Sequence, residues 1–297
     1  MNSPSFRDRI LQQETLNFLL TNRIPRLLVT LIMGRFSKVE HPLVRDLSLW
    51  GWKLFTDLDL SDAQKDRFTS LHDCFTRELK PGSRLIDPDP HVFVSPCDAI
   101  VGECGVVQGQ QVFQAKGFPY SVTELFGNSD DAAKYQGGCY VTLRLRSNMY
   151  HRFHAPYDCH VRHVTYISGD TWNVNPIALK RVEKLFCKNE RAAIRCEIQP
   201  GGQTFTLVAV AAVLVASIRL HCLGSLFHPR YTGPNEIPCE AGFLKGQEMG
   251  WFQHGSTILV FAPKGFALAE GIRSEQEIRM GQKLMVNPSL SVADPQN

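Results

Sequence analysis

The chain has 297 residues, of which 43% are hydrophobic and 21% are charged, and its formal net charge at pH 7 is +3. This length and composition predict a folded globular protein with a substantial core, and so small a positive charge gives no support for a nucleic-acid partner. The nine cysteines are odd in number and include no Cys-x-x-Cys pair. We therefore interpret them as reduced thiols of a cytoplasmic protein, not as a disulfide framework or a zinc ribbon.

Residues 7–60 have a helical pattern, in which apolar residues recur at spacings near three and four. Basic residues are interleaved with them: Arg23, Arg26, Arg35, Lys38 and Arg45. The pattern is typical of a cationic amphipathic segment lying in a membrane interface, and also of core-packing helices with solvated arginines. We expect no secretory signal. The apolar patches Leu16–Leu20 and Leu27–Met33 are shorter than the roughly 20 residues of a membrane-spanning helix.

The rest of the chain predicts a mainly antiparallel β core. A short helix is expected over Ser61–Leu79, and from Pro81 onward proline and glycine separate short β-type runs. The longest apolar stretch, Phe205–Ile218, is rich in valine, which favours a buried strand. The runs assigned to strands are HVFVS, AIVGECGVV, CYVTLRL, CHVRHVTYIS, FTLVAVAAVLVASI and STILVFA.

One more helix is predicted after Asn175, over residues 176–186, because Pro176 suits the first turn of a helix. The expected fold class is therefore α+β, with amphipathic helices before a mainly antiparallel core. We divide the chain into a helical, membrane-associating region at residues 1–60 and a β-rich core at residues 61–297.

Two groups of residues suggest acid–base chemistry. Asp98 stands where a Ser-Pro turn meets a strand, a position in which aspartate usually bonds its own backbone. His151 and His154 are three residues apart, so they would share a face on a helix and point to opposite sides on a regular strand. No carboxylate or thiolate falls at a familiar ligand spacing from them. We therefore assign no metal and favour proton transfer.

The polar segments 169–179 and 187–194 contain Asn, Asp and Pro that suit either turns or a pocket for a polar head group. In WFQHGSTILVF, residues 251–261, polar residues interrupt a strand-like run. Gly255-Ser256 can be a turn or bulge, or the bond itself can be reactive. Ser256 would then need a base and an orienting carboxylate, which His154 or His151 and Asp98 offer.

Together these segments resemble the phosphatidylserine decarboxylase family in its bacterial, membrane-associated form. The resemblance extends from about residue 60 to about residue 285, and its most specific part is KGQEMG at residues 245–250 followed by Gly255-Ser256-Thr257. The other segments that carry it are SPCDA around Asp98, YHRFHAP at 150–156, VNP at 174–176, NER at 189–191, FTR at 75–77, RLID at 84–87 and QAKG at 114–117.

The resemblance implies a zymogen that cuts itself. His154, oriented by Asp98, would deprotonate Ser256, whose oxygen attacks the carbonyl of Gly255. Cleavage between Gly255 and Ser256 would leave a large chain, 1–255, and a small chain, 256–297. The small chain would begin with a covalent pyruvoyl cofactor made from Ser256.

The resemblance also implies the reaction. The pyruvoyl group would form a Schiff base with phosphatidylserine, carbon dioxide would leave, and phosphatidylethanolamine would be released as a step of phospholipid biosynthesis. His151 is the candidate proton donor or carboxylate-site residue. A homodimer of cleaved pairs is implied, bound peripherally to the anionic cytoplasmic face of the bacterial inner membrane through the N-terminal helices.

Two positions depart from the family pattern. His254 stands where the family usually has leucine, and Ala99 follows Asp98 where the family usually has glycine. An imidazole beside the scissile bond would alter the pH dependence of cleavage or compete with His154 as the base. Two other functions stay open: a pyruvoyl-dependent decarboxylase of a soluble amino acid, and a non-catalytic peripheral lipid-binding module in which Gly255-Ser256 is structural.

Overall fold

The computed structural model describes residues 14–114, 118–214, 217–253 and 256–287. Its helices are α2 (Glu14–Asn22), α3 (Arg26–Phe36), α4 (Pro42–Phe55), α5 (Leu71–Phe75), α6 (Val122–Phe126), α7 (Ser129–Ala133), α8 (Pro176–Leu179) and α9 (Leu185–Lys188). Its strands are β1 (Val92–Val94), β2 (Ala99–Val106), β3 (Gln111–Phe113), β4 (Pro119–Ser121), β5 (Cys139–Arg144), β6 (Arg152–His154), β7 (Cys159–Ile167), β8 (Arg191–Ile198), β9 (Thr204–Ala211), β10 (Ile218–Leu220), β11 (Leu226–Phe227), β12 (Glu236–Phe243), β13 (Glu248–Phe252), β14 (Ser256–Ala262), β15 (Ala267–Leu268), β16 (Glu277–Ile278) and β17 (Lys283–Val286).

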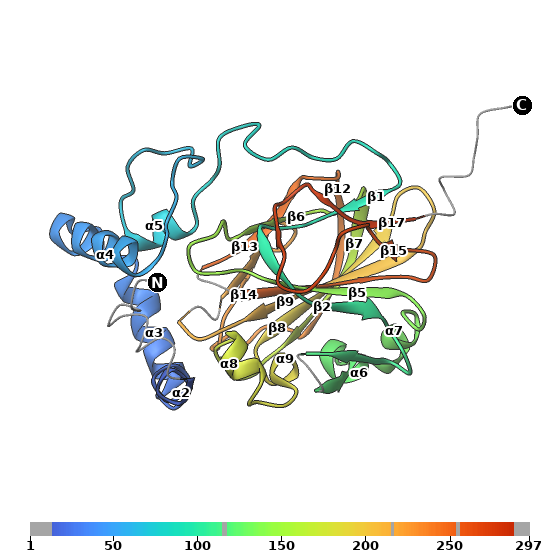
Figure 1. Ribbon diagram of the computed structural model, residues 1–297, viewed down its shortest axis with the longest axis horizontal. Coiled ribbons are helices and arrows are strands. Elements are labelled where there is room, and N and C mark those ends of the chain that lie inside the picture. The colour runs from blue at the N-terminus through green and yellow to red at the C-terminus, as the bar shows by residue number, and fades with distance from the viewer. Residues whose placement is uncertain (1–13, 115–117, 215–216, 254–255, 288–297) are drawn as a thin grey trace, which may run out of the picture.

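An eight-stranded antiparallel sheet organises the molecule, in the order β12-β7-β8-β9-β14-β5-β2-β16. One of its faces packs against the four-stranded sheet β11-β10-β13-β6 and the three-stranded sheet β1-β17-β15, and the largest apolar core lies between them. A second core fills the other face, which α6, α7, α8 and α9 cover (Figure 1). The expected α+β class with a mainly antiparallel core is confirmed.

Strand β9 is apolar along most of its length because both of its faces are buried. In β9, Leu207 and Ala209 point into the core between the sheets, whereas Val208 and Val210 point into the core under the helices. This two-sided burial explains the long apolar run in the sequence. The buried strand expected within Phe205–Ile218 is confirmed as β9, which ends at Ala211.

Both helices expected in the core are shorter than their patterns. Within Ser61–Leu79 the structure forms α5 alone, because the Ser70 hydroxyl caps a helix that starts there by accepting from the N–H of Asp73. The helix expected over residues 176–186 is two helices. Lys184 between them has a φ angle of 52°, in the left-handed region that a continuing helix excludes.

The side chain of Gln114 explains the break between α8 and α9. Its Nε2 donates to the carbonyl oxygens of Leu179 and Val182, and its Oε1 accepts from the N–H of Leu185. Because these groups have a side-chain partner, the backbone does not need to continue the helix. The expected first-turn position of Pro176 is confirmed.

The run 251–261 is not one strand. β13 ends at Phe252 and pairs with β10 and β6, whereas β14 begins at Ser256 and pairs with β9 and β5. The polar residues between them therefore join two different sheets. Both His254 and Gly255 lie outside the described residues.

The N-terminal helices lie at one side of the β core (Figure 1). Arg26 of α3 donates to the Asp170 carboxylate through Nε and Nη2, and its guanidinium lies 3.8 Å from the ring centroid of Trp172. The Thr30 hydroxyl accepts from the N–H of Leu214, just beyond β9. Segment 169–179, whose role the sequence left open, is thus a docking surface for these helices.

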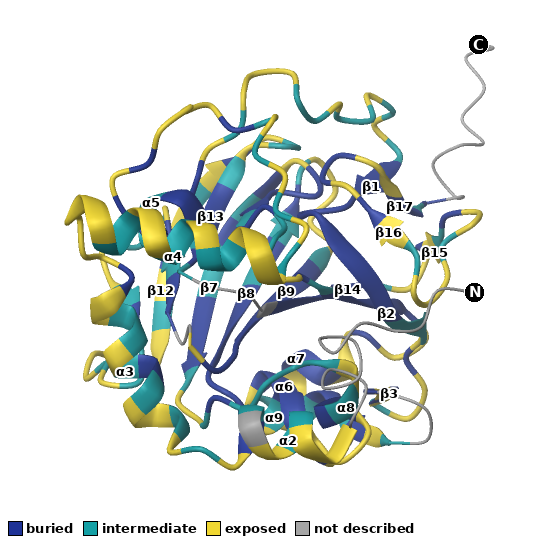
Figure 2. Ribbon diagram, turned by 60° about the vertical axis from the view of Figure 1, so that its left-hand side comes forward, coloured by how far each residue is buried: buried dark blue, intermediate teal, exposed yellow. Residues whose placement is uncertain are grey.

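Helix α4 carries apolar side chains on two opposite sides, one packed against the protein and one exposed. Leu49 and Trp52 pack on a small core with Phe68 and Cys74, so this cluster crosses the domain boundary expected near residue 60. The opposite side of α4 is exposed (Figure 2) and consists of Leu43, Leu47, Trp50, Leu54 and Phe55. Among the described residues, no helix combines the length and the apolarity needed to cross a membrane.

Candidate active site

His154 ends β6 and is buried. Its Nδ1 lies 2.9 Å from the carbonyl oxygen of Gly246, and its Nε2 lies 2.9 Å from the hydroxyl oxygen of Tyr150. Because a carbonyl oxygen only accepts, Nδ1 donates to Gly246 and Nε2 accepts from the Tyr150 hydroxyl. This assignment places the lone pair on Nε2, which is the atom a general base uses.

The same imidazole is held in its neutral form. Burial lowers the pKa of His154 below the ordinary value of 6.5, even though the hydrogen bond to Gly246 and the charges of Glu248 and Asp98 raise it. Removing an imidazole from water disfavours its charged form. His154 is therefore able to take up a proton at neutral pH.

A tight turn at Gly246 positions the carbonyl that holds His154. Gly246 has a φ angle of 82°, and a Cβ atom there would lie 2.8 Å from Cγ1 of Ile86. Its N–H donates to the carbonyl oxygen of Ala155, and the N–H of Ala155 donates to the carbonyl oxygen of Gln247. Only glycine fits both the angle and the space, so this part of KGQEMG builds the support of the imidazole.

Arg152, between the two histidines in the sequence, is fixed by two segments that carry the family resemblance. It donates through Nη1 to Oε1 of Glu248 at 2.9 Å, and through Nε and Nη2 to the carbonyl oxygen of Thr76 at 3.0 and 2.8 Å. Gly250 lets β13 approach β10 closely, because a Cβ atom there would lie 2.0 Å from the carbonyl oxygen of Arg219.

Asp98 immediately precedes β2 and is buried. The guanidinium of Arg84 donates to both of its carboxyl oxygens at 2.5 to 3.1 Å, and the N–H of Met280 donates to Oδ1 at 2.9 Å. Among the described residues, no hydrogen bond joins Asp98 to His154, since both ring nitrogens have other partners. The orienting role of Asp98 stays a prediction.

Ala99, which departs from the family pattern, has an ordinary strand conformation. It pairs with Ile278 across β2 and β16, and its φ angle is not positive. The position therefore does not require glycine, and the exchange does not strain the turn that carries Asp98.

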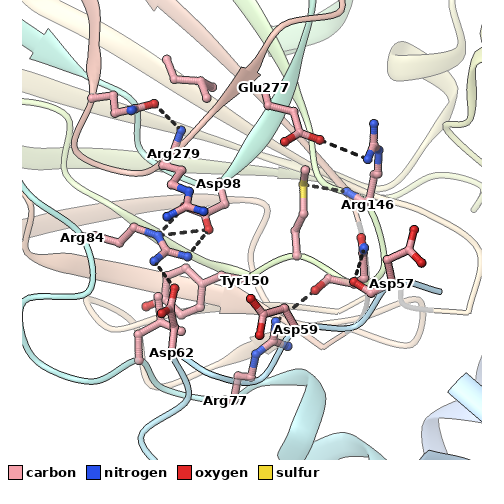
Figure 3. Close-up of a pocket in the computed structure, with 15 residues that line it drawn as sticks. Asp57, Asp59, Asp62, Arg77, Arg84, Asp98, Arg146, Tyr150, Glu277 and Arg279 are labelled. Carbon is pink, nitrogen blue, oxygen red and sulfur yellow. Dashed lines mark hydrogen bonds and ion pairs between the residues drawn. The ribbon is translucent and has the colours of Figure 1, made fainter. Parts of the chain in front are cut away.

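A charged cavity of about 350 Å³ opens beside Asp98, and Figure 3 shows Arg84 between Asp98 and Asp62. Arg84 and Tyr150 also line a neighbouring cavity of about 290 Å³, which His154 lines as well. Asp98 and His154 thus face two cavities that share a wall. The charged residues of the first cavity are Asp57, Asp59, Asp62, Arg77, Arg84, Asp98, Arg146, Glu277 and Arg279.

His151 is fully buried and precedes β6. Its ring centroid lies 3.9 Å from that of Phe75, which stacks on Trp52 of α4 at 5.5 Å. Its carbonyl oxygen accepts from the N–H of Phe252, the last residue of β13. His151 therefore lies beside the strand that leads into residues 253–255, and two ring contacts link it to the N-terminal helices.

Ser256 contributes its backbone to β14, opposite Ala211 of β9. With His254 and Gly255 outside the described residues, the contacts of the scissile bond stay predictions. The structure does place His154 on β6, which pairs with β13, the strand directly before that bond.

Sequence reasoning missed the parts played by Tyr150 and Arg84. Both residues lie in segments that carry the family resemblance. The hydroxyl of Tyr150 reaches the imidazole four residues further along the chain, a contact that a regular strand spacing does not predict. The guanidinium of Arg84 donates to the carboxylate of Asp98, which is 14 residues further along the chain.

The described ranges hold no group of three or more His, Cys, Asp or Glu side chains that could bind a metal ion. All nine cysteines lie within these ranges and are free thiols.

Comparison with known proteins agrees with this site. The family model described as phosphatidylserine decarboxylase matches residues 71–286. The phosphatidylserine decarboxylase proenzyme of Shewanella amazonensis is 34% identical over 272 residues, which cover 87% of this chain and 94% of that protein. The proenzyme of Shewanella baltica is 33% identical, with 87% and 92% covered. The protein is thus an enzyme of the carboxy-lyase class. More narrowly, the chain belongs to the phosphatidylserine decarboxylase family.

Proposed function

We propose that this protein decarboxylates phosphatidylserine to phosphatidylethanolamine with a pyruvoyl group that it makes from Ser256 by cutting itself after Gly255. The observation that carries the proposal is the state of His154. Its imidazole is neutral, its tautomer places the lone pair on Nε2, and it lies on a strand beside the one that leads into the scissile segment. Family membership supplies the reaction.

In the proposed cleavage, Nε2 of His154 takes the proton of the Ser256 hydroxyl, and the serine oxygen attacks the carbonyl carbon of Gly255. The Tyr150 hydroxyl must first release Nε2. Burial raises the pKa of Tyr150, so it remains a neutral donor. The negative charge of Asp98, held in place by Arg84, favours the protonated imidazole that forms.

The sheet explains how the large and small chains would stay together after the cut. β14 pairs with β9 on one side and β5 on the other, while β16 pairs with β2 and β17 with β1. Each of these partners belongs to the proposed large chain, so cleavage breaks one peptide bond and no strand pairing.

Position 256 suits a pyruvoyl group. It begins a central strand whose neighbours on both sides are fixed, and the residue opposite it on β9 is the small Ala211. When present, a pyruvoyl group supplies a carbonyl that reacts with the substrate amine as a Schiff base and withdraws electrons as carbon dioxide leaves. We propose that buried His151 contacts the substrate carboxylate or supplies a proton there.

We further propose that residues 1–60 associate with the membrane and that residues 61–297 form the catalytic core. Exposed apolar side chains on α3 and α4, with exposed Arg23, Arg35 and Lys38, suit an anionic leaflet. Arg26 does not contribute to this surface, because its guanidinium is paired with Asp170 and packed on Trp172. The cytoplasmic face of the inner membrane and a homodimer of cleaved pairs remain proposals that rest on the family resemblance.

The experiment that tests the proposed function uses purified wild-type protein. Intact mass spectrometry is expected to show chains of residues 1–255 and 256–297, with a carbonyl on the small chain that reacts with hydroxylamine. Carboxyl-labelled phosphatidylserine in vesicles is expected to release labelled carbon dioxide, and free L-serine is not. Release from free serine alone would support the soluble amino-acid decarboxylase. One uncut chain without activity would support the lipid-binding module.

The base of the cleavage is tested by substitution of histidines. His154→Ala is expected to accumulate the uncut chain, because it removes Nε2, the proposed acceptor of the Ser256 proton. Asp98→Asn is expected to slow maturation as well, since it removes the charge that favours protonated His154. The readout is the fraction of small chain on a denaturing gel after a fixed expression time.

Two matched variants complete this test. His160→Ala removes an imidazole from β7 and is expected to mature normally. His254→Ala is expected to mature as well. If His154→Ala matures at the wild-type rate and His254→Ala does not, the base has been assigned to the wrong residue.

A further inference from the structure

Glu190 is a fully buried acid without a hydrogen-bond partner among the described residues. The side chains of its two sequence neighbours are fully hydrogen-bonded. The Asn189 side chain makes three hydrogen bonds to main-chain groups, and the Arg191 guanidinium donates to four carbonyl oxygens. Structural roles therefore account for the neighbours but not for Glu190. Buried polar groups are nearly always satisfied, so an orphaned carboxyl group needs an explanation.

The strand register places Glu190 in the same cross-strand row as residue 256, the proposed cofactor position. Its carbonyl oxygen accepts from the N–H of Ala211, and Ala211 lies opposite Ser256. Positions 190, 211 and 256 thus follow one another across three chain segments, roughly 9 to 10 Å from the first to the last. The residue in the middle is the buried Ala211, whose side chain is a single methyl group.

The side of the sheet that Glu190 faces follows from alternation. Ala192 and Ile194 of β8 point into the core between the sheets, and Arg191 points the other way, to α6. Glu190 therefore lies on the side of the core between the sheets. On that side the Tyr166 side chain lies close enough to lower the pKa of Glu190 in part. The Tyr166 hydroxyl donates its hydrogen bond to the carbonyl oxygen of His228, so within the described part of the chain the Glu190 carboxyl group is left without a partner of hydrogen-bond geometry.

The same surroundings keep the carboxyl group protonated. Burial raises the pKa of Glu190 to about 8, and the interaction with Tyr166 lowers it only in part. Tyr166 is the titratable group of the described residues that contributes to this shift. At neutral pH Glu190 is a neutral acid, which can donate a proton.

We propose that Glu190 is the acid that supplies the proton replacing carbon dioxide on the substrate, which leaves His151 the other proposed role, contact with the substrate carboxylate. The inference rests on the proposed function, because it requires substrate bound at residue 256. When the bond between the α-carbon and the carboxylate breaks, carbon dioxide leaves and its electron pair stays with the substrate. The Glu190 proton then forms the new C–H bond, and the carboxylate left behind regains a proton from solvent. Each turnover releases one carbon dioxide and consumes one solvent proton.

Glu190→Gln tests the proposal, because glutamine keeps the shape and the hydrogen-bonding groups but has no acidic proton to transfer. The variant is expected to mature to two chains with the wild-type carbonyl content. Its kcat on phosphatidylserine in mixed micelles is expected to fall about 100-fold or more, with KM within about threefold. A kcat within tenfold of the wild type overturns the proposal.

The pH dependence gives a second readout that needs no variant. Because the acid form is active and its pKa is about 8, wild-type kcat is expected to fall as the pH rises through about 8. The residual rate of Glu190→Gln is expected to lack this fall. A wild-type kcat that stays constant up to pH 9 overturns the proposal, even if Glu190→Gln fails to mature.

A matched control separates the chemistry from the loss of a buried acid. Asp131 is also buried, but Lys134 and Arg195 pair with it on the far side of β8. Asp131→Asn is expected to lower the melting temperature and keep kcat. If the wild type itself shows no cut and no carbonyl, the proposed function fails. If the wild type is mature and Glu190→Gln is equally active, only the assignment of Glu190 fails.

Discussion

Ser256→Ala is expected to leave one uncut chain of 297 residues, with decarboxylation at least about 10⁴-fold below the wild type, the scale of loss when a nucleophile is removed. The methyl group cannot attack the carbonyl carbon of Gly255, and no pyruvoyl group can form from alanine. Both stages of the proposed chemistry therefore fail together. Intact mass spectrometry measures the first stage, and release of labelled carbon dioxide measures the second.

Ser274→Ala is the matched control for this loss. Ser274 is another serine of the proposed small chain, and its hydroxyl donates to the carbonyl oxygen of Gly102 at 2.9 Å. Losing that hydrogen bond is expected to cost about 1 kcal/mol of stability and to leave cleavage unchanged. A Ser256→Ala protein that still yields a 42-residue small chain, 256–297, would show that another residue is the nucleophile.

The double variant Leu43→Ser with Leu47→Ser is expected to lose activity on vesicles while keeping it on dispersed short-chain phosphatidylserine. These side chains are 75% and 67% exposed on α4. Each would contribute about 1.5 kcal/mol or more when buried in lipid, so their loss reduces membrane partitioning on the order of 100-fold. Co-sedimentation with vesicles that contain an anionic lipid measures the partitioning directly.

Leu85→Ser with Leu244→Ser is the matched pair. These leucines are 84% and 70% exposed but lie outside the N-terminal helices. This pair is expected to bind vesicles as the wild type does. Equal binding by both double variants and the wild type would show that the α4 surface does not meet the membrane. Point substitutions are preferable to deletion of the helices, because Arg26 and Thr30 hold α3 on the core.

The position of α4 gives a physical reason for joining membrane binding to catalysis. Its inner side places Trp52 on Phe75, and Phe75 lies against the ring of His151. The outer side carries the exposed leucines. A phospholipid substrate remains in its bilayer, so a site that processes its head group has to lie near the interface. One helix separates the proposed docking surface from the histidine pair.

Much of the secondary structure could be predicted because it depends on local patterns. The valine-rich run produced β9, and Pro176 begins α8 as its position indicates. Predictions failed where a distant side chain intervened. The helix over residues 176–186 is interrupted because Gln114, more than 60 residues earlier, bonds the backbone at the break. Residues 191–198 form β8, a central strand that was not predicted, and its first half lies in segment 187–194, which was interpreted as turn or pocket.

The candidate site shows the same difference between what local patterns predict and what distant contacts decide. The motifs identified the family, which the comparisons confirm, and through that resemblance they named Asp98, His151, His154 and Ser256 as site residues whose roles stay predictions. They did not reveal that the Gly246 carbonyl, 92 residues from His154, sets the tautomer of its imidazole. Nor did they reveal that the carboxylate of Asp98, whose orienting role stays a prediction, accepts hydrogen bonds from Arg84 and from the N–H of Met280.

The sequence alone determined which segments are helix-like or strand-like, which family the motifs indicate, and which residues are able to carry acid–base chemistry. Only the tertiary structure decided which of those residues meet, because hydrogen-bond partners and burial come from strands distant in the chain. Glu190 is the clearest case. Glutamate is a residue type that usually lies at the surface, and the sequence does not show that Glu190 is buried. Only the packing of β7, β8 and β9 removes water from its carboxyl group, and this burial raises its pKa so that the group is neutral at pH 7.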